Sequence, residues 1–324
     1  MRRRVLVGLA ALATAPLGMH RTAAAQAFPS KGLRIIVPFP AGGPTDQVAR
    51  MVAQKLQDQY GQSVVVDNRP GGGGQIGMSQ VQQAPADGHT LIIGDMGLYA
   101  INTTLYTKLS YDVQKELVPI TLAMSAPMVL IVPANSPDNS VADLVRRARS
   151  GATLNFASQG IGTGGHLIGE MMRVESGGRL NHVPYKGSAP AMQDLIAGQV
   201  DLFFEVLGAA LPQAKAGKVK MLALAAPQRS KLAPDLPTTA EVGFPQITMA
   251  PWFGFAARTG TPEPALRKLQ ADIVAAINSP DIVTRLQTVG FDPIPGTPEQ
   301  MAKVIRDETE RWGAVVRSSG AKVE

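Results

Sequence analysis

Cysteine is absent from the 324 residues, and aromatic residues make up only 5% of them. The lack of cysteine excludes disulfide bonds, a thiolate nucleophile, a cysteine zinc site and a lipid-modified cysteine. The net positive charge is also small beyond the N-terminus. Four of the 31 basic residues and none of the 25 acidic residues lie in the first 25 positions, which leaves 27 basic against 25 acidic residues in the rest of the chain. Nucleic-acid binding needs a concentrated basic face, so we exclude nucleic acid as a partner.

Long apolar runs are confined to the N-terminus. The run from Val5 to Met19 is shorter than the ~20 residues that span a bilayer. It follows three arginines and precedes two overlapping small-x-small sites that end at Ala25 and Ala27. We therefore predict a signal peptide over residues 1–25, cleaved between Ala25 and Gln26 or between Ala27 and Phe28. The export route stays open between the general secretory and the twin-arginine pathway. The mature protein is expected to be periplasmic.

Strand-like and helix-like patterns alternate along the rest of the chain, which is typical of an α/β protein with largely parallel sheets. Helix starts are predicted at Ser140, at Thr261-Pro262 and at the capping box Thr297–Gln300. Apolar or β-branched runs predict strands at residues 33–37, 64–66, 90–94, 119–123, 128–132, 154–157, 182–185, 200–204 and 219–225.

Two glycine-rich loops each follow a predicted strand and precede a predicted helix. Glycine lets a ligand approach the backbone, and a helix N-terminus offers free N–H groups with partial positive charge, so each loop fits an anion. For the first loop the alternative is a tight turn with Thr45 or Asp46 as the helix N-cap. Two such loops in two domains can close on one small anion. The residues are Ala41, Gly42, Gly43, Thr45 and Asp46 in the first loop, and Ser158, Gly160, Gly162, Thr163 and His166 in the second.

A third glycine run begins after Asn68 and is interpreted either as a flexible connection or as part of the cleft lining. Asp201 and Glu205 are four residues apart on one predicted strand and therefore point the same way. A glycosidase pair is one interpretation of these acids, and solvated or capping side chains are the other. Glu205 is the more interesting acid, because it lies at the carboxyl end of the strand, where α/β proteins bind ligands.

Enzyme motifs are weak in this sequence. Gly217-Lys218 lacks the rest of a phosphate-binding loop, and Phe156 stands where a nucleophile elbow needs glycine. His166 and Glu170 are spaced to share a metal, but a helix-surface pair is the more common outcome of that spacing. We therefore predict no catalytic residues, no metal and no cofactor.

Read together, the motifs resemble the substrate-binding proteins of tripartite tricarboxylate transporters, the Bordetella uptake gene (Bug) family. The resemblance covers essentially the whole mature chain. It is carried by Ile36–Gly43 with Thr45-Asp46, Val65–Gly71, Asp87-Gly88, Ala157-Ser158 with Gly160, Gly162, Thr163 and His166, His182–Gly187, Gly198–Asp201, Leu236–Thr238, Trp252–Gly254 and Gly260–Pro262.

The resemblance implies a two-domain periplasmic-binding-protein fold of type II, in which a ligand cleft lies between domains that close like a Venus flytrap. Domain 1 would comprise residues 26–124 and 248–324, and domain 2 residues 125–247. The cleft would hold a small organic carboxylate, namely a di- or tricarboxylate, an acidic amino acid or an aromatic acid. The two glycine loops would hold the carboxylate, and ligand-selective contacts are expected near Asn68, Tyr185 and Glu205.

The implied partners are the membrane subunits of a tripartite tricarboxylate-type transporter, with the protein itself a monomer. Two alternatives from other classes stay open. One is a ligand sensor that feeds a membrane histidine kinase, and the other is a hydrolase built on the same fold. Neighbouring genes would distinguish transport from sensing.

Overall fold

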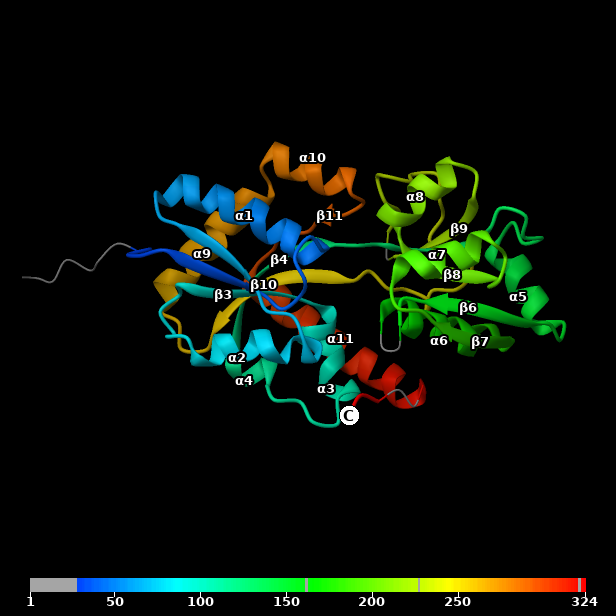
Figure 1. The fold of residues 1–324 in the computed structure, drawn as a ribbon, viewed down its shortest axis with the longest axis horizontal. Helices are drawn as coiled ribbons and strands as arrows, with labels where there is room; N and C mark the ends of the chain where they lie inside the picture. The colour runs from blue at the N-terminus through cyan, green and yellow to red at the C-terminus, as the bar shows by residue number, and fades with distance from the viewer. Residues whose placement is uncertain (1–27, 161–162, 227, 320–321) are drawn as a thin grey trace, which may run out of the picture.

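The computed structural model describes residues 28–160, 163–226, 228–319 and 322–324. The predicted signal peptide and Gly162 lie outside these ranges. The chain forms two mixed sheets, one of six strands and one of five. We call the part built on the six-stranded sheet the first lobe (residues 28–125 and 252–324) and the part built on the five-stranded sheet the second lobe (residues 128–225). Figure 1 shows the two lobes side by side along the long axis.

The six-stranded sheet has the order β11-β4-β10-β3-β1-β2. Strand β1 is central to its parallel part, where Ile35 pairs with Val66 on one side and Leu91 on the other. Strand β10 runs antiparallel to both β3 and β4. The strands are β1 (Leu33–Val37), β2 (Val64–Asn68), β3 (Thr90–Asp95), β4 (Leu117–Ser125), β10 (Trp252–Arg258) and β11 (Asp292–Pro293).

The five-stranded sheet has the order β7-β6-β8-β5-β9. Strand β6 is parallel to β7 and β8, whereas β5 is antiparallel to β8 and β9. The expected parallel pairing therefore holds for the βα units, β1 with β2 and β3, and β6 with β7 and β8. The strands on either side of the two crossings, β4, β5, β9 and β10, pair antiparallel. The strands are β5 (Met128–Pro133), β6 (Thr153–Ser158), β7 (Arg179–Pro184), β8 (Leu202–Val206) and β9 (Val219–Ala225).

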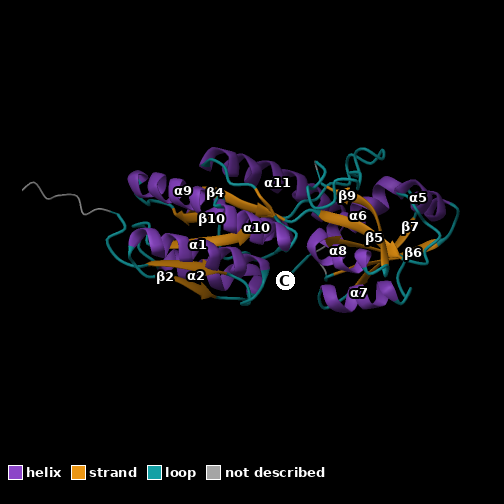
Figure 2. Ribbon diagram, turned by 90° about the horizontal axis from the view of Figure 1, so that it is seen from above, coloured by secondary structure: helices purple, strands orange, loops and turns teal. Residues whose placement is uncertain are grey.

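Helices cover both faces of the sheet in each lobe (Figure 1 and Figure 2). No helix within the described ranges is long and apolar enough to cross a membrane. The α-helices are α1 (Pro44–Tyr60), α2 (Gln75–Gln83), α3 (Asn102–Leu105), α4 (Val113–Glu116), α5 (Val141–Arg149), α6 (Gly164–Ser176), α7 (Ser188–Ile196), α8 (Leu207–Lys215), α9 (Glu263–Ile277), α10 (Pro280–Thr288) and α11 (Pro298–Ser319), with short helical turns η1 (Gly72–Gly74) and η2 (Gly97–Ile101).

Two of the three predicted helix caps are confirmed. The Ser140 hydroxyl accepts a hydrogen bond from the Asp143 amide at 3.1 Å. In the capping box, the Gln300 amide donates to the Thr297 hydroxyl at 3.2 Å, and the Thr297 amide donates to the Gln300 side chain at 2.7 Å. A helix does begin after Thr261-Pro262, as predicted, but Thr261 does not cap it: the Thr261 hydroxyl donates to the Arg258 carbonyl, and Pro262 is the N-cap of α9.

The chain crosses between the lobes twice, at residues 126–127 and along 226–251. The Ala126 amide donates to the Pro251 carbonyl at 2.7 Å, so the two crossing segments lie side by side. One hydrophobic cluster continues through them, since it contains Tyr99 of the first lobe, Phe156 of the second and Met249 of a crossing segment. Burying a side chain of this kind stabilises the fold by about 1.5–3 kcal/mol, so the crossings are packed as well as hydrogen-bonded.

Candidate functional site

The first glycine loop turns the end of β1 into α1. Gly42 has a φ of 84°, which favours glycine, and the neighbouring Gly43 is the N-cap of α1 in an extended conformation. No described side chain caps this helix start. The alternative in which Thr45 or Asp46 is the N-cap is wrong, because α1 already begins at Pro44, whose fixed φ suits the first helical position.

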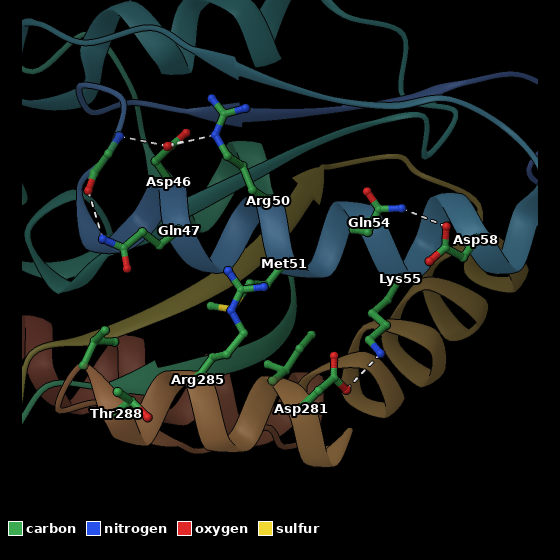
Figure 3. Close-up of a pocket in the computed structure, with 13 residues that line it drawn as sticks. Asp46, Gln47, Arg50, Met51, Gln54, Lys55, Asp58, Asp281, Arg285 and Thr288 are labelled. Atoms are coloured by element: carbon green, nitrogen blue, oxygen red, sulfur yellow. Dashed lines mark hydrogen bonds and ion pairs between the residues drawn. The ribbon is translucent and has the colours of Figure 1, made fainter.

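Asp46 folds back and closes the first loop. Its Oδ2 accepts hydrogen bonds from the Gly42 amide and from Arg50 Nε, each at 2.9 Å, and Asp46 and Arg50 point toward each other in Figure 3. Burial raises the pKa of Asp46, but these hydrogen bonds outweigh the burial and hold the pKa below its ordinary value. Asp46 is therefore a negatively charged carboxylate at neutral pH. Its role is to hold the first loop in shape, since its charge does not attract an anion.

Asn68 joins the same assembly from the end of β2. Its side-chain nitrogen donates to the Phe39 carbonyl at 3.1 Å, and its oxygen accepts from Arg50 Nη2 at 3.0 Å. Arg50 thus bridges Asp46 and Asn68. The sequence reading did not single out Arg50, although its spacing of four residues from Asp46 on one helix was a usable signal.

The second glycine loop joins β6 to α6. The loop is held from within: the Thr163 hydroxyl donates to the Gly160 carbonyl at 2.7 Å, and the Gly160 amide donates to Ser158 Oγ at 3.1 Å. Ser158 is 0% exposed. Thr163 is the N-cap of α6, where no side chain in the described ranges caps the helix. In this structure the hydroxyls of Ser158 and Thr163 therefore serve the loop, and their predicted contact with a ligand stays a prediction.

His166 lies in the first turns of α6 and stacks on His182 of β7, with ring centroids 4.1 Å apart. Burial lowers the pKa of His166, and it lowers the pKa of His182 to about 4. Both rings are therefore neutral near pH 7. No group of three or more histidine, aspartate or glutamate side chains placed to hold a metal occurs among the residues that the structure describes.

Glu205 lies beneath the second loop and is 1% exposed. One of its oxygens accepts from the Val206 amide at 2.6 Å and from Gln159 Nε2 at 3.4 Å, and the other accepts from the Ser188 hydroxyl. Burial raises the pKa of Glu205. All of these partners belong to the second lobe, so they do not place Glu205 against the first loop. The contact of Glu205 with a ligand stays a prediction.

Tyr185 likewise supports α7. Its hydroxyl donates to Asp194 Oδ2 at 2.7 Å, and burial together with that carboxylate raises the pKa of Tyr185 to about 12. Sequence reasoning missed Ser188 and the glycine before it, although Gly187 follows a strand and precedes a helix as in the other two loops. Its amide donates to the Gln159 carbonyl at 3.1 Å, so α7 begins against the second loop.

A groove of 880 Å³ lies between α1 and α10 (Figure 3). It is bridged by Lys55 and Asp281, whose side chains are 2.9 Å apart. All of its lining residues belong to the first lobe, so the second loop does not contribute to it. They are Gly42, Asp46, Gln47, Arg50, Met51, Gln54, Lys55, Asp58, Asp281, Ile282, Arg285, Thr288 and Val289.

The two loops lie on the sides of their lobes that face each other, since β1 and β6 each point their carboxyl ends toward the other lobe in Figure 1. The start of α6 also lies against one crossing segment and the first residue of β5. A Cβ on Gly164 would be 3.0 Å from the sulfur of Met249 and 3.2 Å from that of Met128. The end of the second glycine loop thus lies at the region where the chain passes between the lobes.

Residues 48–321 match the family model described as the tripartite tricarboxylate transporter family receptor. The chain belongs to this receptor family. The receptor is 35% identical to BugT of Bordetella pertussis over 322 residues, which cover 98% of each chain. It is 39% identical over 318 residues to a protein encoded in the tcbD-tcbE intergenic region of Pseudomonas sp. strain P51, covering 97% of this chain and 94% of that relative.

Solved structures give the same result. The receptor is similar to Rpa4515 of R. palustris with adipate (36% identity, TM-score 0.78, 91% of this chain and 100% of that one). It is also similar to MatC of Rhodopseudomonas palustris with bound malate (32% identity, TM-score 0.72, 89% and 100%), and to the periplasmic binding protein BugD (32% identity, TM-score 0.74, 92% and 100%). The predicted family and the α/β periplasmic-binding-protein fold are confirmed, and this family is one of solute-binding receptors, not of enzymes.

Proposed function

We propose that the protein is an exported receptor that captures a small organic carboxylate between its two lobes and delivers it to the membrane subunits of a tripartite tricarboxylate-type transporter. The observation that carries this proposal is the pair of helix starts at Gly43 and Thr163, one in each lobe, which no described side chain caps. The first N–H groups of each helix have no intrahelical partner and carry partial positive charge, so a carboxylate satisfies both needs.

We propose that the carboxylate lies against the backbone of Gly42, Gly43, Gly160, Gly162 and Thr163. The amides of Gly42 and Gly160 donate within their own loops, so the proposed donors are the first N–H groups of α1 and α6. The similar structures with adipate and malate support a dicarboxylate as the first ligand to test. Each helix start contributes roughly 0.3–1 kcal/mol to a nearby anion at an exposed site and more when the site is partly buried. Two such starts hold a carboxylate without an arginine clamp.

The lobes are proposed to act as two domains, residues 26–124 with 248–324 and residues 125–247, which close about the two crossing segments. Ligand selects the compact state, because contact with both loops at once requires the lobes to approach. Small-angle scattering should show a smaller radius of gyration at saturating ligand. An unchanged radius at saturation contradicts a site between the lobes.

Calorimetry with adipate, malate, glutamate and benzoate tests the proposed function, with the diamide of adipate as the uncharged control. We expect saturable binding of at least one acid, no binding of the diamide, and full recovery of the acid afterwards. Loss of the acid with appearance of a product would support an enzyme instead. Equal binding of the diamide would remove the role of the anion.

We propose export from the N-terminal order of arginines, apolar run and small residues, with cleavage after Ala25 or Ala27. Mass spectrometry of protein recovered from the periplasm should give a mass without the first 25 or 27 residues. A full-length soluble product in the cytoplasm would contradict this.

A further inference from the structure

Ser158 and His182 meet behind the second glycine loop. They lie on the neighbouring parallel strands β6 and β7, where His182 pairs with Phe156, two residues before Ser158. Ser158 Oγ and His182 Nε2 are 2.6 Å apart. Nothing in the proposed carboxylate site uses this contact, yet Ser158 is the residue at which the loop begins.

The direction of this hydrogen bond follows from the donors and acceptors around Ser158. Its hydroxyl proton has two acceptors in reach, His182 Nε2 at 2.6 Å and the Gly160 carbonyl at 3.1 Å. The Gly160 carbonyl already accepts from the Thr163 hydroxyl at 2.7 Å and from the Thr163 amide at 3.3 Å, which occupy its two lone pairs. The Ser158 proton therefore goes to His182, and a chain runs from the Gly160 amide through the Ser158 hydroxyl to the imidazole.

The imidazole is held so that it can accept that proton. Its ring lies between Phe156, at a centroid distance of 4.8 Å, and His166, at 4.1 Å, and it is nearly parallel to both. Burial, and next to it the neighbouring His166, lower the pKa of His182 to about 4. Neutral His182 with its proton on Nδ1 leaves Nε2 free to accept.

We propose that His182 is a positioning residue for ligand binding: by accepting the Ser158 hydroxyl proton it fixes Ser158, Gly160 and Thr163 in the arrangement that leaves the start of α6 open to a carboxylate. This inference rests on the proposed function. Without the acceptor, the Ser158 proton competes with Thr163 for the Gly160 carbonyl, and the loop must be ordered again when ligand binds, which costs affinity.

The first test is His182→Phe, which keeps an aromatic ring in the stack and removes the acceptor. We expect the affinity for adipate or malate, whichever the parent binds, to fall roughly 5- to 10-fold, the value of one lost hydrogen bond. His89→Phe is the matched control. His89 is also buried, accepts from the Ser30 amide at 3.2 Å and contacts the Phe28 ring at 4.9 Å, but it lies in the first lobe at the start of β3. Its affinity should equal that of the parent.

Three further measurements separate positioning from packing. Ser158→Ala should lose as much affinity as His182→Phe, and the double variant no more than either one. His182→Gln, whose amide oxygen can accept, should recover part of the loss. Nitrogen NMR of the parent should show His182 with a bare Nε2, and Ser158→Ala should shift that signal.

Each outcome has a meaning. Parent-like affinity of His182→Phe, equal losses in the Phe and Gln variants, additive losses in the double variant, or a protonated Nε2 in the parent would each overturn the positioning role. A parent that binds none of the acids would overturn the proposed function, and the positioning role with it. If His182→Phe does not fold, Ser158→Ala and the NMR signal decide the question without touching the stack.

Discussion

Gly43 holds the N-cap of α1 with a backbone that serine adopts as readily as glycine, at φ −73° and ψ 172°. A Cβ there would meet only the Pro40 carbonyl, at an ordinary 3.6 Å. Gly42 is less suitable for mutation, because its φ of 84° makes any side chain strained. The structure therefore identifies Gly43 as the position where the two effects of a side chain, on the helix and on the ligand, can be separated.

Gly43→Ser should raise the free energy of unfolding by a few tenths of a kcal/mol, because the hydroxyl caps the first turn of α1. The same hydroxyl then occupies N–H groups proposed for the ligand, so the affinity for the carboxylate should fall roughly 5- to 10-fold. Urea denaturation and calorimetry measure the two effects. Pro262→Ser is the control. Pro262 is the N-cap of α9, which no described side chain caps, and the substitution should leave the affinity for the carboxylate unchanged. Equal affinities of Gly43→Ser and the parent would place the ligand elsewhere.

Glu205 makes a prediction about pH. Burial raises its pKa in the folded protein above the ordinary value. The folded state therefore binds the proton more tightly than the unfolded state, and stability falls as pH rises from the ordinary glutamate pKa through the raised one. Glu205→Gln should lack this fall. Denaturant titrations of parent and variant at successive pH values measure it, and a pH-independent difference between the two curves would contradict it.

At the scale of elements, helix starts were predictable where the signal is local. Ser140 and Thr297 find their partners three residues away, and both predictions are confirmed. Thr261 carries a similar signal, but its hydroxyl turns back to Arg258 at the end of β10. A neighbouring strand thus outcompeted the helix for the same hydroxyl, which local sequence does not reveal.

Strand partners and buried contacts were beyond the sequence for the same reason. Phe255 of β10 pairs with Thr121 of β4, and no periodicity names a partner so far away along the chain. The glycine loops could be found because glycine next to a helix start is a local pattern. The partners of Ser158 and Glu205 could not, since His182 and Ser188 reach them only through the packing of β7 and α7 in the folded lobe.

The cap of α5 allows a direct measurement at this scale. Ser140→Ala removes the hydroxyl that accepts from the Asp143 amide and donates to the Asp143 carboxylate at 2.8 Å. The free energy of unfolding should fall by about 1 kcal/mol, with no change in carboxylate affinity, because α5 lies away from both glycine loops. Ser150→Ala, at the other end of the helix, is the control and should cost less. A loss of affinity in Ser140→Ala would mean that α5 is coupled to the site.

At the scale of the whole molecule, the two lobes approach each other closely at one pair of glycines, Gly208 and Gly290, where backbone lies against backbone. A Cβ on Gly208, in the first turn of α8, would lie 2.1 Å from the Val289 carbonyl, and a Cβ on Gly290 would lie 2.1 Å from the Gly208 Cα. This contact is close to both glycine loops. Val289 lines the same groove as Gly42, and Gly208 lies two residues after β8, whose last residue follows Glu205. Closing of the lobes would compress this contact further.

Gly208→Ala should therefore oppose closure. Gly290 is unsuitable for the test, since its φ of 86° itself favours glycine, whereas Gly208 lies within a helix, where alanine is favoured by up to about 1 kcal/mol. The methyl group cannot share space with a backbone carbonyl, so the lobes should stay further apart. We expect roughly 10-fold weaker carboxylate binding and a smaller decrease in the radius of gyration on saturation than in the parent, measured by calorimetry and small-angle scattering. Lys215→Ala adds alanine at an exposed position of the same helix and should behave like the parent. If Gly208→Ala binds and compacts as the parent does, the glycine pair does not limit closure, and the lobes must move about a different axis.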